Sequence, residues 1–298
     1  MELSTPVLEP RWSNPITCDE TIAVLGSCFA EQLGKQMQWL SLPVCNNPFG
    51  VLYNPASLAR SVHYLLPSDF LFSSKEVIAR DGGWNSFSHH GSFTEQTPAA
   101  FLLRANGALV KARMQFAAAS RVVVSLGTAW CYRHLETDQI VSNCHKIPAR
   151  AFQREFLEVP QAVEWLSGAI EATDQAAREG KIVPKEWIFT VSPIRHRKDG
   201  LHENQISKAS LLLTVRELER HFPNVRYFPA YEILLDELRD YRFYAEDLVH
   251  PSAVAVRYIW ERFVDTAYAP EAKDELLQRD KEARRQQHRP IQKNNLSL

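Results

Sequence analysis

Short runs of mostly apolar residues recur along the chain, and turn-forming residues follow each of them. The runs cover residues 22–25, 121–126, 187–191 and 225–229. Runs of this length are typical of strands that are buried on both faces of a parallel sheet. A shorter strand is expected at 44–46. Between the runs, apolar residues recur at helical spacing, which predicts helices over about 29–40, 55–66, 97–119, 160–178, 211–218 and 253–268.

The alternation of strands and helices predicts one α/β domain over residues 1–270. We expect a three-layer α/β/α sandwich with a mostly parallel central sheet, similar to flavodoxin. Residues 67–95 are rich in loops and predict a lid-like insertion, and residues 130–142 predict a hairpin. Residues 271–298 are highly charged and then polar, which predicts a frayed helix and a partly disordered tail.

Composition narrows the class of protein further. The 298 residues are 45% hydrophobic and carry a net charge of -1, so nothing indicates a partner nucleic acid. No apolar run approaches the length of a membrane span, and the start lacks the pattern of a signal peptide. The five cysteines are scattered, which favours reduced thiols in the cytoplasm. The histidines lack metal-ligand spacing, and no cofactor or metal is expected.

The first candidate for chemistry lies where the first strand passes into a helix, at Gly26-Ser27-Cys28. The first backbone N–H groups of such a helix have no intrahelical partners and can stabilise an oxyanion. A nucleophilic serine would be well placed there, although Ser27 could equally be the helix N-cap. Cys28 is an alternative nucleophile, but we expect its side chain to point into the packing between helix and sheet.

The second candidate is the stretch Asp247-Leu248-Val249-His250-Pro251. Pro251 disfavours helical geometry at His250 and suits the first turn of the next helix, so His250 should lie at the end of a loop. Asp247 can then accept the imidazole N–H and stabilise the imidazolium. The alternative is a surface aspartate beside a histidine cap.

Together these stretches resemble the SGNH (GDSL-type) hydrolases, in which a serine follows the first strand and Asp-x-x-His precedes the last helix. The chain also resembles the GSCFA family, whose name is spelled by residues 26–30. The resemblance includes the stretches at 126–130, 143–146, 192–196, 202–204 and 247–252. It implies the SGNH fold and an esterase that removes a small O-acyl group, such as acetyl, from a small molecule or a carbohydrate. An acyltransferase and a non-catalytic binding module on the same fold are the alternatives.

By this resemblance Ser27 is the nucleophile, His250 the general base and then acid, and Asp247 the residue that orients His250. The backbone N–H of Ser27 and that of Gly50 would be oxyanion donors. The asparagine that normally supplies a third donor is missing, because the corresponding strand ends in Gly-Thr-Ala-Trp. Asn143 is our candidate replacement, and Asn47 is the second choice. For both residues the alternative is a structural role in a turn.

Substrate contacts are expected from the same end of the sheet. The basic loop with Arg195 and His196 follows the third long strand and could bind an anionic group, or could simply be solvated. Asn47 is also a candidate for contact with the substrate. Trp84 and His90, on the predicted lid, are expected to line the pocket.

Overall fold

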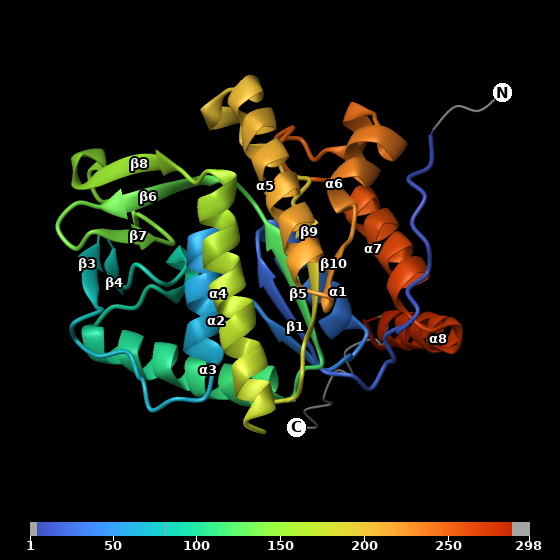
Figure 1. Ribbon diagram of the computed structural model, residues 1–298, viewed down its shortest axis with the longest axis horizontal. Helices are drawn as coiled ribbons and strands as arrows, with labels where there is room; N and C mark the ends of the chain where they lie inside the picture. Colours follow the sequence, from blue (N-terminus) through green and yellow to red (C-terminus); the bar gives the residue numbers. More distant parts are fainter. Residues whose placement is uncertain (1–4, 81, 288–298) are drawn as a thin grey trace, which may run out of the picture.

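The central sheet is parallel and has five strands, as the alternation of strands and helices predicts. We describe a computed structural model that defines residues 5–80 and 82–287. The strand order is β10 (Val225–Tyr227), β9 (Glu186–Val191), β5 (Arg121–Leu126), β1 (Ile22–Gly26) and β2 (Val44–Asn46), and all four pairings are parallel. The order reverses at β1 and β5, because the chain goes first to one edge and later to the other (Figure 1).

Helices cover both faces of this sheet. The longer helices are α1 (Cys28–Trp39), α2 (Pro55–Leu65), α3 (Pro98–Ala118), α4 (Val159–Arg178), α5 (Leu201–His221), α7 (Ala253–Ala267) and α8 (Pro270–Gln287). The shorter helical segments are η1 (Gly91–Phe93), η2 (Ala149–Ala151), η3 (Arg197–Asp199), α6 (Ala230–Glu232), η4 (Ile233–Leu238) and η5 (Tyr241–Phe243). The three-layer α/β/α architecture that the sequence predicts is therefore confirmed.

Alternation along the strands assigns side chains to two hydrophobic clusters. In β1, Ala23 and Leu25 face the cluster that α2, α3, α4 and α5 cover, whereas Ile22 and Val24 face α1 and α7. Since every residue of β1 is almost fully buried, the strand reads as a continuous apolar run and not as an alternating one. The two clusters fix both helical layers on the sheet, and with them the loops at its edges.

Two small antiparallel sheets lie beside the central one. One consists of β7 (Gln139–Val141), β6 (Trp130–His134) and β8 (Phe152–Phe156), so the predicted hairpin is present and gains a third strand. The other is the hairpin of β3 (Ile78–Arg80) and β4 (Gly83–Asn85), within the predicted insertion. Figure 1 shows both on the side of the molecule that carries α2 and α3.

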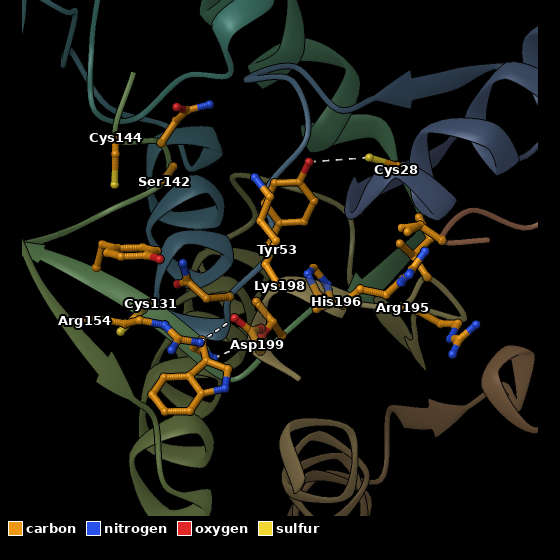
Figure 2. A pocket seen from close by; sticks show the side chains of 18 of the residues that line it. Cys28, Tyr53, Cys131, Ser142, Cys144, Arg154, Arg195, His196, Lys198 and Asp199 are labelled. Atoms are coloured by element: carbon orange, nitrogen blue, oxygen red, sulfur yellow. Dashed lines mark hydrogen bonds and ion pairs between the residues drawn. The ribbon is translucent and has the colours of Figure 1, made fainter. Parts of the chain in front are cut away.

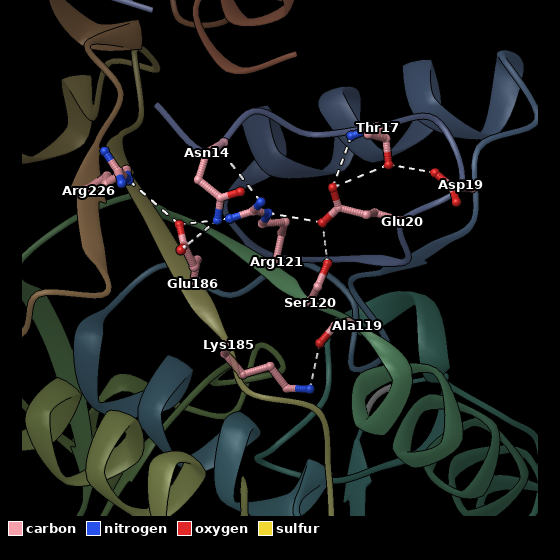
Figure 3. A network of polar contacts seen from close by, with 10 residues as sticks. All are labelled: Asn14, Thr17, Asp19, Glu20, Ala119, Ser120, Arg121, Lys185, Glu186 and Arg226. Atoms are coloured by element: carbon pink, nitrogen blue, oxygen red, sulfur yellow. Dashed lines mark hydrogen bonds and ion pairs between the residues drawn. The ribbon is translucent and has the colours of Figure 1, made fainter. Parts of the chain in front are cut away.

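Charged side chains fix the amino-terminal edge of the sheet (Figure 3). Arg121, at the start of β5, is almost fully buried and contacts Glu20 at 3.1 Å and Glu186 at 2.7 Å. Ser120 donates a hydrogen bond to the same Glu20 carboxylate. Because removing one partner of such a buried group leaves the other unpaired, this network holds β5, β9 and the lead-in segment in register.

The segment after residue 270 begins as an ordered helix. Helix α8 buries Ala272 and Leu276, and Asp280 accepts a hydrogen bond from the indole of Trp39 at 3.0 Å. The predicted disorder falls on 288–298, which lie outside the described residues. None of the helices in the described chain combines the length and the hydropathy that a membrane crossing requires.

Candidate active site

The loops at the carboxyl edge of the sheet enclose a cavity of about 660 Å³ (Figure 2). This is the edge at which open α/β sheets bind their ligands. The cavity lies between the start of α1, the β6–β8 sheet, the segment after β9 and the loop before α7. Cys28, Tyr53, Trp130, Lys198 and His250 are among the residues that line it.

Ser27 lies at this edge, but its hydroxyl does not face the cavity. The side chain is 1% exposed and its Oγ forms a 2.8 Å hydrogen bond with Ser125 Oγ on the neighbouring strand. The same oxygen accepts from the N–H of Phe29 at 3.2 Å, so Ser27 is the N-cap of α1. Its backbone N–H donates to the carbonyl of Ser125 at 3.0 Å. The expected contact between Ser27 Oγ and the imidazole of His250 does not occur among the described residues.

Cys28, the first residue of α1, takes the position that we expected for the serine. Its side chain is partly exposed and lines the cavity together with His250. The same two residues also line an adjoining cavity of about 470 Å³. Burial raises the pKa of the Cys28 thiol, while the hydroxyl of Tyr53 acts in the opposite direction. The thiol therefore needs a base in order to react as a thiolate.

The loop with Asp247 and His250 has the geometry that its spacing predicts. Nδ1 of His250 lies 2.6 Å from Oδ2 of Asp247. The other carboxylate oxygen accepts from the backbone N–H groups of Val249 and His250, at 2.9 and 3.0 Å. Leu248 has a left-handed φ of 56°, which turns the chain back on itself. The N–H of His250 and the imidazole lower the pKa of Asp247 to about 2, so its carboxylate is charged at neutral pH.

Arginines of the segment after β9 hold this loop in place. Arg195 donates to the carbonyl of Leu248 at 3.2 Å, and Arg197 donates to that of Asp247 at 3.4 Å. The guanidinium of Arg195 also lies over the ring of Tyr244, 5.3 Å from its centroid. Both arginines line the cavity, but these contacts engage them with the histidine loop.

His196 lines the same cavity without adding positive charge to it. Burial, with a smaller contribution from Lys208, lowers its pKa to about 4, so the imidazole is neutral at pH 7. Lys208 itself is buried beneath the cavity, where its ammonium donates to the carbonyls of Gly127 and Ser192 at 2.6 and 2.8 Å. Burial lowers the pKa of Lys208 to about 7. Neither group was expected from the sequence to be perturbed.

Besides the N–H of Ser27, two more of the expected oxyanion donors are used elsewhere. The N–H of Gly50 closes a turn onto the carbonyl of Asn47 at 2.7 Å. The amide of Asn47 binds both backbone groups of Gly26, accepting at 2.7 Å and donating at 3.3 Å, and so fixes the end of β1. Asn143 lines the cavity, and its Oδ1 accepts from the N–H of His145. Of the two asparagines, only Asn143 keeps its side-chain N–H groups free of a hydrogen bond within the described chain.

Trp84 and His90 lie away from this cavity. Trp84 pairs with Glu95 through both backbone groups, and the imidazole of His90 caps η1 by accepting from Ser92. Neither lines the cavity that holds Cys28 and His250. The insertion instead packs against α3, with Phe93 in the hydrophobic cluster. The expectation that these two residues contact substrate is not supported, because the insertion turns its aromatic side chains toward the core.

The part of the cavity lining that comes from β6 and β8 was not predicted from the sequence. Arg154 of β8 lies over the ring of Trp130, 3.8 Å from its centroid, and pairs with Asp199 at 2.5 Å (Figure 2). This contact joins the small β-sheet to the segment after β9 across the mouth of the cavity. Within the described residues, no group of three or more His, Cys, Asp or Glu side chains gathers as metal ligands would.

Comparison with family models places this site in a known family. The model of the GSCFA family matches residues 21–263, which include Cys28, Asp247 and His250. The chain belongs to the GSCFA family. The five residues that spell the family name run from the last residue of β1 into α1, and the third of them, Cys28, is the one that lines the cavity.

Among solved structures, this GSCFA protein is similar to one described as "a putative platelet activating factor from Streptococcus pneumonia". The sequence identity is 14% and the TM-score is 0.41, over 84% of this chain and 85% of that chain. No curated protein matches this member of the family.

Proposed function

We propose that this GSCFA protein hydrolyses a small O-acyl ester by covalent catalysis, with Cys28 as the nucleophile. The observation that carries the proposal is the shared cavity of Cys28 and His250, residues from opposite ends of the chain, beside the 2.6 Å contact between His250 and Asp247. The hydroxyl of Ser27 is bonded to that of Ser125 and does not line the cavity, which supports Cys28 over Ser27 as the attacking group.

The roles of the three residues follow from their contacts. Nδ1 of His250 donates to Asp247, so the neutral imidazole carries its lone pair on Nε2 and can take the proton of the Cys28 thiol. Asp247 fixes this tautomer and stabilises the imidazolium that forms. The raised pKa of Cys28 keeps the thiol protonated in the resting protein, so the proton moves when substrate is bound.

The reaction has two halves. Sulfur attacks the ester carbonyl, the carbon–oxygen bond to the leaving alcohol breaks, and His250 gives its proton to that oxygen. The product is a thioester on Cys28. His250 then removes a proton from water, the hydroxide attacks the thioester carbonyl, and the thiolate leaves and regains its proton. The start of α1 favours both attacks, because its dipole and free N–H groups stabilise negative charge.

The cavity suits an acyl compound of modest size with an anionic group. Trp130 and Tyr132 of β6 supply an aromatic surface, and Lys198 also lines the cavity. Since Arg195 is engaged with the histidine loop and His196 is neutral, Lys198 is the cation of this segment best able to meet a carboxylate or phosphate of the substrate. Arg195 and His196 would then shape the site and not neutralise the ligand.

The test compares two cysteine variants. Cys28→Ala should lower kcat for p-nitrophenyl acetate by at least about a thousandfold, the scale of losing a nucleophile. Cys144→Ala is the matched control, since Cys144 is also partly exposed and lines the same cavity. Peptide mass spectrometry after rapid quenching should find the acetyl group on Cys28. Full activity of Cys28→Ala would overturn the proposal.

A further inference from the structure

The backbone of Tyr53 is fixed from two sides. Its carbonyl accepts hydrogen bonds from the N–H groups of Gly127 and Thr128, at 2.8 and 3.1 Å, where the chain leaves β5. The next residue, Asn54, caps α2 by accepting from the N–H of Ser57 at 2.8 Å. A side chain that leaves such an anchored segment is confined to the few rotamers that its backbone allows.

The ring of Tyr53 fills a space that a glycine provides. A Cβ at position 127 would lie 3.1 Å from Cδ1 of the ring and 3.1 Å from the carbonyl oxygen of Tyr53. A larger residue there would push the ring away from the end of β5. On its other side the ring meets His196 edge to face, with centroids 6.1 Å apart and an interplanar angle of 88°. The direction of the Cα–Oη axis is therefore fixed by packing.

This packing brings the hydroxyl of Tyr53 to the thiol. Oη lies 3.5 Å from Sγ of Cys28, and this is the only hydrogen bond of that hydroxyl within the described residues (Figure 2). Burial raises the pKa of Tyr53 well above its usual range, so the phenol keeps its proton at neutral pH. This phenol can donate a hydrogen bond toward Sγ, the atom from which the reaction starts.

Two backbone donors expected for the oxyanion are already occupied. The N–H of Ser27 is bonded to Ser125, and that of Gly50 is bonded to Asn47. The N–H of Cys28, at the start of α1, has no partner in the preceding turn of the helix. Acyl transfer needs donors that meet the carbonyl oxygen when it becomes negatively charged. Beside Sγ, the structure offers the N–H of Cys28 and the hydroxyl of Tyr53.

We propose that Tyr53 is a catalytic residue whose hydroxyl donates a hydrogen bond to the oxyanion formed on the substrate as Cys28 attacks. The proposal rests on the proposed function, because it needs an acyl transfer at Cys28. As the carbon–sulfur bond forms, the π electrons of the carbonyl move to its oxygen. Tyr53 binds that oxygen and keeps its own proton, while the thiol proton is held by His250. When the oxyanion collapses, the leaving oxygen takes the proton from His250.

The experiment measures Tyr53→Phe, with Tyr64→Phe as the matched control. Tyr64 is half-buried like Tyr53 and its hydroxyl also has a single hydrogen-bond partner among the described residues, Ser88 at 3.4 Å, but it does not line the cavity. We expect Tyr53→Phe to lower kcat for p-nitrophenyl acetate by about a hundredfold, the usual effect of removing one oxyanion donor, with KM nearly unchanged. The control should keep its kcat. Thermal unfolding will show whether each variant is folded.

A second readout separates this role from a merely structural one. Alkylation of Cys28 by iodoacetamide consumes the thiolate at a saturated carbon and forms no oxyanion. Its rate should fall far less than kcat in Tyr53→Phe. Equal losses in both rates would mean that Tyr53 only positions or activates the thiol, and an unchanged kcat would also overturn the proposal.

Failure of the proposed function can be distinguished from failure of the role of Tyr53 by the cysteine variant. If Cys28→Ala kept the activity, or if the unmodified protein were never acylated at Cys28, the nucleophile assignment and the role of Tyr53 would fall together. If Cys28→Ala were inactive and Tyr53→Phe fully active, only the role of Tyr53 would fall.

Discussion

Replacement of Ser27 by alanine separates a structural serine from a nucleophilic one. Ser27→Ala removes an N-cap from α1, which costs about 0.5–2 kcal/mol in proteins. It also leaves the hydroxyl of Ser125 buried without its 2.8 Å partner, and such a group costs about 1–3 kcal/mol. The two effects together predict a loss of about 1.5–5 kcal/mol in the free energy of unfolding.

This loss of stability should lower the melting temperature and leave kcat almost unchanged. In a domain of this size, each kcal/mol lowers Tm by about 2–4 °C. We therefore expect a fall in Tm of roughly 3–20 °C, measured by circular dichroism. At a temperature where the variant is folded, Ser27→Ala should keep most of its kcat, since Cys28 and His250 are untouched.

A double-mutant cycle tests the physical reason. In Ser27→Ala/Ser125→Ala both members of the buried pair are gone, so no hydroxyl is left unsatisfied. The double variant should be more stable than the sum of the two single losses predicts, by about 1 kcal/mol. A Ser27→Ala variant that folds with an unchanged Tm and has lost its kcat would refute this reasoning, and would make Ser27 the nucleophile.

Three further changes test the surroundings of the site. Asp247→Asn should lower kcat by a factor on the order of 10²–10⁴, because the tautomer of His250 is no longer fixed. Since the pKa of Asp247 is about 2, titration of this carboxylate should not contribute to the pH profile of the unmodified protein above about pH 4. A step in that profile above about pH 4 that disappears in Asp247→Asn would contradict this. Lys198→Gln should lower kcat/KM for the anionic ester p-nitrophenyl hemisuccinate by about two- to fivefold and leave kcat/KM for the uncharged p-nitrophenyl butyrate unchanged. Lys181→Gln, at an exposed lysine, is the control. Equal effects on both esters would exclude a contact between Lys198 and the substrate anion. The pKa of Lys208 is about 7 in the folded protein and near 10.4 in the unfolded chain, so between these pH values the unfolded state binds more protons and the free energy of unfolding should rise with pH. Urea titrations at several pH values should show this rise in the unmodified protein. If the rise persisted in Lys208→Met, other groups would be its cause.

The central fold could be predicted because its signals are local. The strands β1, β5 and β9 are buried on both sides, so their residues form apolar runs that no surface element would carry. Strand β8 was missed for the opposite reason. It lies at the edge of a small sheet, its sequence is mostly polar, and it pairs with β6 across the loop that contains η2. Such a pairing depends on tertiary contacts and leaves no periodic signal.

The histidine loop could also be predicted, because its parts are neighbours in sequence. Asp247 lies three positions before His250, and Pro251 keeps the histidine out of the following helix. The choice between Ser27 and Cys28 was harder, since it depends on the residue at which α1 begins. Ser27 has an extended ψ of 174°, which makes it the cap and directs its hydroxyl back toward the sheet. A shift of one residue in the helix start would exchange the two side chains.

The proposed oxyanion donor, Tyr53, illustrates what sequence position does not convey. A missing asparagine after β5 directed attention to residues that follow in the chain, such as Asn143. In the folded protein, however, the ends of parallel strands converge, and a side chain from the segment after β2 reaches the same place. Gly127 appears in the sequence as an ordinary turn glycine, yet its lack of a Cβ is what admits the ring of Tyr53. A donor lost from one loop can thus be replaced from another, provided that the first loop keeps the space open.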